Sequence, residues 1–352
     1  MPAIVFEQEF SDFKPRRVHF DFANGVVLFS GGSPRITKRW TCPDYEPLPD
    51  LEMHGIYDIG SNGLYLGFDD GVQARDSQTG SVLWEAGHAE ACLVDPTSGI
   101  VVAQRDDRSI SLINPKNGEL VVPRLIPHPS SIVALSTSTD GKLCVVGHGG
   151  EVRLWYLENG KPAGRLSSFV DDVVSGCISS DGTEVAVVNS KRMEVWNTKR
   201  KELSATRIPV HQAFAGVQSG NFRNRFAVSE VRVEPNPKFT PSGSQKRWIE
   251  TGSTFLFQGD ALEPTAELDH PAVWFSPVGT LAVGYRERHP RDNDIGDYSI
   301  KVWKVEAFGA DEPTRLECDA PVYSAAASSD GRYVAIVEVG RLKVWDLQTQ
   351  CV

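Results

Sequence analysis

The sequence predicts an all-β protein built from repeated four-stranded antiparallel units. Similar segments recur at 136–160, 179–199, 276–305 and 328–349, and each predicts a strand, a turn, a second strand, a second turn and a strand ending near a tryptophan. Three of these segments carry Asp-Gly in the first turn, which between apolar runs is a strong hairpin signal. Repeated hairpins at a fixed period therefore define the fold class.

A column of mostly bulky residues extends the repeat through the chain. Its members are Trp40, Arg75, Ile113, Trp155, Trp196, Phe257, Trp303 and Trp345. Successive members are 35, 38, 42, 41, 61, 46 and 42 residues apart, against about 40–45 residues for a four-stranded propeller blade. One large residue at a fixed place in each unit indicates packing rather than a cofactor cage.

The chain resembles the WD-repeat β-propeller family along its whole length. The family's Trp-Asp dipeptide is kept at Trp345–Asp346, and its Gly-His pair at Gly87–His88. Its aspartate, six residues before the column, matches at Asp69, Asp107 and Asp297. The resemblance implies a single closed β-propeller over residues 1–352 with four-stranded antiparallel blades. Eight blades are the preferred count, and seven the alternative if residues 18–50 form a lead-in rather than a blade.

The N-terminal segment is expected to close the ring. Residues 4–10 alternate Ile4, Phe6 and Phe10 with charged or smaller residues, a pattern typical of a half-buried strand. The last column residue leaves room for only three strands in the final blade. We therefore predict that residues 4–10 supply its outer strand, ahead of a first inner strand at Val18–Phe22. Closure of this kind removes exposed sheet edges.

Composition excludes several classes of function. The net charge of −10 disfavours nucleic-acid binding, which depends on clustered Lys and Arg. No apolar run approaches the ~20 residues needed to span a bilayer, and the acidic N-terminus does not resemble a secretory signal. The six cysteines are too scattered for a zinc cluster or a disulfide framework. We expect a cytoplasmic protein that acts as a monomer or as a subunit of a hetero-complex.

No motif predicts a catalytic, cofactor or metal site. The nucleophile-elbow, zinc-protease, phosphate-loop and dinucleotide motifs are absent from the sequence. A faint calcium-loop pattern at Asp292, Asp294 and Asp297 lacks the terminal Glu that such a loop needs. His88 and His270 are expected to form structural hydrogen bonds with Asp107 and Asp297. The alternative function is a propeller enzyme or metal-dependent hydrolase that uses the central channel.

Two insertions, at 229–252 and 285–297, account for the two longest column spacings. Both follow a second strand, and because each strand crosses the sheet once, both should project from the same face. Exposed Trp and Arg residues are typical of interface hot spots. The candidate partner-binding residues are Arg232, Lys246, Arg247, Trp248, Arg286, Arg288, His289 and Arg291. We expect a non-catalytic interaction module or scaffold that binds a protein or peptide on this face.

Overall fold

The structure is a computed structural model. It describes residues 2–12, 15–21, 25–31, 36–53, 55–59, 64–68, 71–95, 97–125, 128–167, 172–209, 213–219, 225–235, 248–258, 263–268, 273–275, 281–284, 300–304, 313–320, 322–328 and 330–350. Hydrogen bonding groups the strands of these residues into eight four-stranded antiparallel sheets. No helix that could cross a membrane occurs in this part of the chain.

The first four blades follow one another along the chain. Blade 1 contains β2 (Pro15–Asp21), β3 (Val26–Gly31), β4 (Thr37–Thr41) and β5 (Pro47–Leu51). Blade 2 contains β6 (Gly55–Ile59), β7 (Leu64–Phe68), β8 (Val72–Asp76) and β9 (Val82–Ala86). Blade 3 contains β10 (Ala91–Val94), β11 (Val101–Gln104), β12 (Ile110–Ile113) and β13 (Leu120–Leu125). Blade 4 contains β14 (Ile132–Thr137), β15 (Lys142–Gly147), β16 (Glu151–Tyr156) and β17 (Pro162–Ser167).

The remaining blades continue the same pattern. Blade 5 contains β18 (Ser175–Ile178), β19 (Glu184–Val188), β20 (Met193–Asn197) and β21 (Glu202–Arg207). Blade 6 contains β22 (Ala213–Ser219), β23 (Arg225–Pro235), β24 (Trp248–Gln258) and β25 (Ala266–Leu268). Blade 7 contains β26 (Val273–Phe275), β27 (Leu281–Gly284), β28 (Ile300–Lys304) and β29 (Thr314–Leu316). Blade 8 contains β30 (Val322–Ala327), β31 (Tyr333–Glu338), β32 (Arg341–Gln350) and β1 (Pro2–Glu9).

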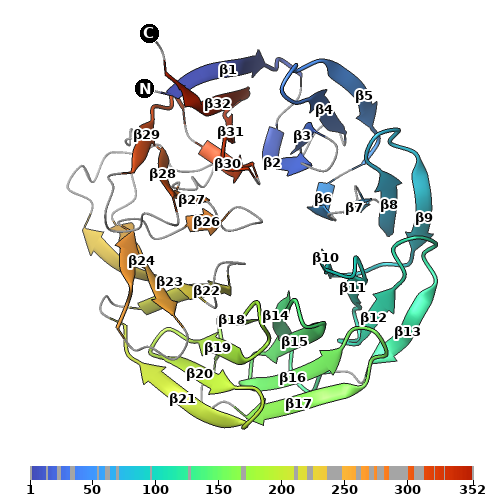
Figure 1. The fold of residues 1–352 in the computed structure, drawn as a ribbon, viewed down its shortest axis with the longest axis vertical. Coiled ribbons are helices and arrows are strands. Elements are labelled where there is room, and N and C mark those ends of the chain that lie inside the picture. Colours follow the sequence, from blue (N-terminus) through green and yellow to red (C-terminus); the bar gives the residue numbers. More distant parts are fainter. Residues whose placement is uncertain are drawn as a thin grey trace.

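The sheets stand around a ring, with each first strand near the centre and each fourth strand on the perimeter (Figure 1). The prediction of a propeller with four-stranded antiparallel blades is therefore confirmed. The eight sheets match the larger of the two blade counts, because the segment 18–50 contributes a full sheet, β2–β5, rather than a lead-in.

The N-terminal strand completes blade 8, as the alternation of its apolar residues predicts. β1 pairs antiparallel with β32 and places Ile4 opposite Trp345. Phe6 and Phe10 pack against a core cluster shared by blades 8 and 1. Figure 1 shows the two ends of the chain beside each other at this sheet.

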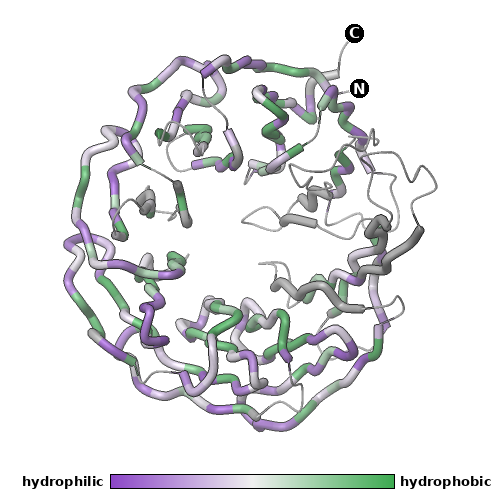
Figure 2. Tube along the Cα trace, turned by 180° about the vertical axis from the view of Figure 1, so that it is seen from behind, coloured by the Kyte–Doolittle hydropathy of each residue, from purple (hydrophilic) through white to green (hydrophobic). Residues whose placement is uncertain are grey.

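The predicted column lies on the third strand of every blade. Its register is constant, as Trp155 opposite Leu143 and Trp196 opposite Val185 illustrate. Hydrophobic segments lie within the blades, and hydrophilic segments recur along the perimeter (Figure 2). The core itself is divided among neighbouring sheets: Trp196, for example, packs with the buried residues of blade 4. The column residues therefore hold each blade to the one before it.

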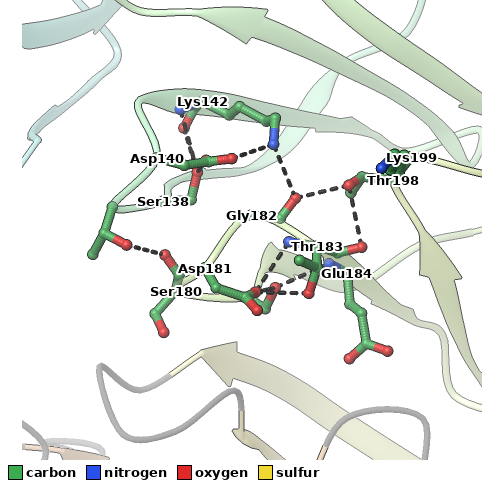
Figure 3. Close-up of polar contacts among 12 residues, drawn as sticks. Ser138, Asp140, Lys142, Ser180, Asp181, Gly182, Thr183, Glu184, Thr198 and Lys199 are labelled. Atoms are coloured by element: carbon green, nitrogen blue, oxygen red, sulfur yellow. Dashed lines mark hydrogen bonds and ion pairs between the residues drawn. The ribbon is translucent and has the colours of Figure 1, made fainter.

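The Asp-Gly turns join blades 4 and 5 on the face opposite the insertions (Figure 3). The Thr139 hydroxyl donates to the Ser180 carbonyl at 2.8 Å, and the Lys142 ammonium donates to the Gly182 carbonyl at 3.2 Å. Lys142 also pairs with Asp140. Because Gly182 has φ +73° and lies against the Asp140 carboxylate, the two turns are packed with no space for a side chain at position 182.

Candidate protein-interaction face

The face that carries the insertions is defined by strand order. It receives the turns between second and third strands and the connections that enter each first strand. We call it the insertion face. The insertion at 229–252 includes the end of β23 and the start of β24, whereas residues 285–297, which connect β27 to β28 in the sequence, lie outside the described residues.

Much of the first insertion is regular strand rather than loop. β23 continues to Pro235 and β24 begins at Trp248, and their register runs without a break from Arg225 opposite Gln258 to Pro235 opposite Trp248. The residues 229–235 and 248–252 therefore extend the blade, and only 236–247 lie outside the described residues. The Pro, Gly and Ser content of that central stretch suggested a longer loop, whereas cross-strand pairing organises both of its flanks.

The end of this hairpin extends past the strands that flank it. The pairing of β22 with β23 ends at Val231, and the pairing of β25 with β24 ends at Thr254. Residues 232–235 and 248–251 are paired with each other beyond those points. We call these eight residues the hairpin arm. Among the described strands no third strand pairs with these eight residues.

The base of the arm is anchored by a buried ion pair. Glu230 is 0% exposed, and its Oε1 lies 3.5 Å from Nη2 of Arg207 in the outer strand of blade 5. The Arg207 guanidinium also lies 4.5 Å from the ring centroid of Phe257 and 5.2 Å from that of Phe255. A buried charge needs a charged or hydrogen-bonding partner to be stable. This contact therefore connects the base of the arm to blade 5.

Two of the eight candidate partner-binding residues belong to the arm. Arg232 is opposite Thr251, and Trp248 is opposite Pro235. The other six, and the second insertion itself, lie outside the described residues: Lys246, Arg247, Arg286, Arg288, His289 and Arg291. The structure thus places Arg232 and Trp248 on the two strands of one hairpin.

A second charged group on the insertion face lies at the closure of the ring. The Lys343 ammonium is 2.6 Å from Asp319 and 3.3 Å from the buried Glu338. Arg341 pairs with Asp319 and also with Glu7 and Glu9 of β1. A hydrogen bond and the positive charge of Lys343 lower the pKa of Asp319, whereas burial raises the pKa of Glu338. These contacts fasten the first strand to the last one.

The histidine prediction on this face is wrong by one residue. His88 Nδ1 lies 2.9 Å from Asp106, and both side chains are exposed. Asp107 instead accepts hydrogen bonds from the Ser109 backbone and from Arg124. The turn after β11 directs Asp107 back to its own hairpin, which the family spacing does not reveal. His270 and Asp297 lie outside the described residues.

The inner strands use hydroxyl groups to join blades. Ser136 Oγ of β14 accepts a hydrogen bond from the Ile178 backbone of β18 at 3.0 Å. Ser324 Oγ of β30 accepts one from the Val18 backbone of β2 at 3.3 Å. Within the described residues, no three His, Cys, Asp or Glu side chains are grouped so that they could hold a metal ion. The hydroxyl groups of Ser136 and Ser324 therefore link the inner strands of neighbouring blades.

The residues that position the arm were missed in the sequence. Arg207 is the last residue of an outer strand, and Glu230 lies inside an apolar alternation. The sequence offers one signal for this ion pair: a single acidic residue within an apolar strand pattern, because a buried charge needs a partner. The sequence does not indicate which blade supplies that partner.

Comparison with known proteins supports the architecture. No family model and no curated protein matches the chain. Among solved structures, the chain is similar to the crystal structure of the computationally designed Ika8 protein, with a TM-score of 0.72 and 17% sequence identity. The match covers 98% of this chain and 99% of the designed one. At that identity the similarity concerns the fold alone.

Proposed function

We propose that this propeller is of the WD-repeat type and acts as a non-catalytic interaction module or scaffold. Its partner would be a protein or peptide that binds the insertion face, where blades 6 and 7 carry their insertions. The motif residues at Trp345–Asp346 and Gly87–His88 support the family assignment. Fold alone does not identify a function, so the proposal rests on a feature of this face.

The hairpin arm is the observation that carries the proposal. A strand at the edge of a sheet is a common docking surface for an extended peptide, because the main chain of the peptide can add to the sheet. The ion pair of Arg207 and Glu230 holds the base of the arm against blade 5, and restricting a binding segment in this way lowers the entropy lost on binding. Arg232 and Trp248 are of the residue types that supply most interface energy.

The charges of the two insertions are mixed. Residues 229–252 contain three acids and four bases, and residues 285–297 contain four acids and three bases. Charges at the rim of an interface steer association more than they hold the complex. We therefore expect added salt to slow association modestly without abolishing binding.

The decisive experiment shortens the arm and measures capture of the partner. Residues 232–251 are replaced by Asn-Gly, since Val231 and Gly252 are register partners and a two-residue turn can join them. Partners captured by the intact protein are identified by mass spectrometry, and the affinity of one purified partner is then measured. We expect the shortened protein to remain folded and to lose that partner.

Point variants make the experiment sharper. Trp248→Ala and Arg247→Ala should each weaken binding by ~2 kcal/mol or more if they are hot spots. The matched control is Tyr156→Ala, which removes an aromatic residue that is 40% exposed near the opposite face. If the shortened protein binds the same partner with unchanged affinity, the insertion face is not the interface.

The proposal includes a cytoplasmic location. It rests on the sequence, in which the six cysteines are too scattered for a disulfide framework, and structural disulfides are typical of oxidising compartments. Fractionation of the source cells with an antibody to the protein tests this part, and recovery in a secreted fraction would contradict it.

A further inference from the structure

The junction between blades 3 and 4 differs from three other described junctions near the centre of the ring. The inner strands β14 and β18 lie against each other, as do β18 and β22, and β30 and β2. The contact between β10 and β14 is weaker than in these three pairs. Every residue of β14 is consequently half-buried, whereas three of the four residues of β18 are fully buried.

The weaker contact accompanies a difference in the sequence of β10. The backbone bridges between inner strands use Ser136 and Ser324. The blades can be aligned by the register between their first and second strands. In this alignment Leu93 of β10 takes the position of Ser136, and Ala91 takes the position of Ser324. Neither residue can accept a hydrogen bond through its side chain. β10 therefore lacks the hydroxyl that would hold it to β14.

A crevice of about 480 Å³ occupies this junction. Its walls include Leu93 from β10 and Ile132 and Leu135 from β14, which lie at the margin of the core cluster between the two blades. The volume falls within the roughly 300–1,000 Å³ that is usual for ligand sites. The crevice is therefore large enough for a small ligand or a long side chain.

A polar pair lies at one end of the aliphatic walls. Gln104 is 8% exposed. When the blades are aligned by strand register, the equivalent residues in blades 4, 5 and 8 are Val146, Val188 and Val337. Its amide donates to Glu90 Oε2 at 2.6 Å, and the Glu90 backbone donates to the Gln104 carbonyl at 2.9 Å. Replacing a valine by a buried amide costs stability unless the amide is bonded. In this protein the Gln104 amide is bonded to the Glu90 carboxylate and orients it.

We propose that the crevice binds an alkylammonium or alkylguanidinium group, such as the side chain of Lys or Arg in a peptide. Glu90 is the single charged residue among the described residues that line it. Its carboxylate suits a cation, and the walls of Leu93, Ile132 and Leu135 suit an aliphatic chain that leads to that cation. The net charge of −10 favours a basic ligand at longer range. This site is independent of the hairpin arm.

The test compares capped amino acids that share one aliphatic chain. Nα-acetyl-lysine amide and Nα-acetyl-norleucine amide are titrated into the full-length protein, and the labelled methyl groups of Ile132 and Leu135 are followed by NMR. We expect saturable shifts at these methyls, with norleucine at least fivefold weaker. A third titration with n-pentylamine separates the sources: tighter binding of the lysine derivative assigns a peptide side chain, and tighter binding of the amine assigns a free amine.

Two variants connect the affinity to the carboxylate. Glu90→Gln should weaken the lysine derivative about tenfold, because hydrogen bonds to charged groups contribute roughly 1.5–3 kcal/mol, and should leave norleucine within twofold. Glu85→Gln is the matched control, since Glu85 is an exposed acid on β9 outside the crevice. Unchanged methyl spectra of the free variants establish that both fold. Equal affinity for the lysine and norleucine derivatives would overturn the proposal. So would an unchanged affinity of the Glu90→Gln variant for the lysine derivative, or NMR shifts confined to another blade.

Discussion

Ile4 in the first strand lies opposite Trp345 in the last. In blades 1 to 5, the matching position is filled by a residue from the same blade, as with Leu203 opposite Trp196 and Pro47 opposite Trp40. The N-terminal strand thus occupies an ordinary outer-strand position, and the ring is closed by hydrogen bonds between the two ends of the chain.

Deleting residues 1–12 should destabilise the protein strongly. The deletion removes the packing of Phe6 and Phe10, which is worth up to about 1.5–3 kcal/mol for each side chain, and it exposes the edge of β32. Thermal unfolding and size-exclusion chromatography measure the effect. Val5→Ala is the control, because Val5 is already 38% exposed. A soluble deletion variant with an unchanged melting temperature would show that β1 is dispensable for closure.

Replacing Asp319 should change how stability depends on pH. Lys343 lowers the pKa of Asp319 in the folded protein, so the carboxylate stabilises the fold above its unfolded pKa of ~3.9. This contribution is lost as the pH falls through the lowered folded value. Asp319→Asn should therefore flatten the acid limb of the melting temperature below about pH 4.

Two comparisons isolate the Asp319 effect. Glu338 has the opposite sign, because burial raises its pKa and its contribution is lost as the pH rises through that raised value. Asp44→Asn is the matched control, because it removes an exposed carboxylate on the opposite face. Identical pH profiles for Asp319→Asn and wild type would contradict the prediction.

Loss of a column tryptophan should cost far more than loss of Trp248. Trp196 is 7% exposed, and its Nε1 donates to Glu194 at 3.0 Å. Trp196→Ala should lower the free energy of unfolding by about 3–5 kcal/mol, as measured by urea denaturation. Trp248 belongs to the arm, beyond the flanking strands, so Trp248→Ala should have little effect. Equal losses would mean that the arm packs on the ring.

Two glycines with similar backbone angles should respond differently to alanine. Gly141 has φ +78° and Gly182 has φ +73°, but no atom lies within 4 Å of a Cβ at 141, whereas a Cβ at 182 would overlap Asp140. Gly141→Ala should cost only the backbone strain of about 1–2 kcal/mol. Gly182→Ala should cost more, because Asp140 must leave Ser138 and Lys142 (Figure 3). Equal melting temperatures for the two variants would refute this close approach.

The column and the ring closure could be predicted from sequence because both are periodic. Even Arg75, which replaces an aromatic residue, keeps its place on a third strand and reaches the Glu52 carbonyl before its own blade. The alternation in residues 4–10 likewise identified β1 to within two residues at its start. Local patterns of this kind report strand pairing directly.

The candidate sites depend on contacts between blades, and these contacts leave no periodic pattern in the sequence. The continuation of β23 to Pro235 depends on pairing with a strand that begins at Trp248, across a stretch rich in turn-forming residues. Gln104 differs from a strand residue of another blade only when the registers are aligned, and its partner Glu90 precedes the strand. These sites therefore required the three-dimensional arrangement.

Pro2 and Gln350 are register partners at the end of blade 8, and Figure 1 shows the termini together there. β32 runs away from the insertion face, so both termini leave the ring on the side opposite the hairpin arm. Any domain, tag or surface joined to either terminus would therefore be attached on the face opposite the insertion face. The hairpin arm would then remain directed toward the surrounding solution.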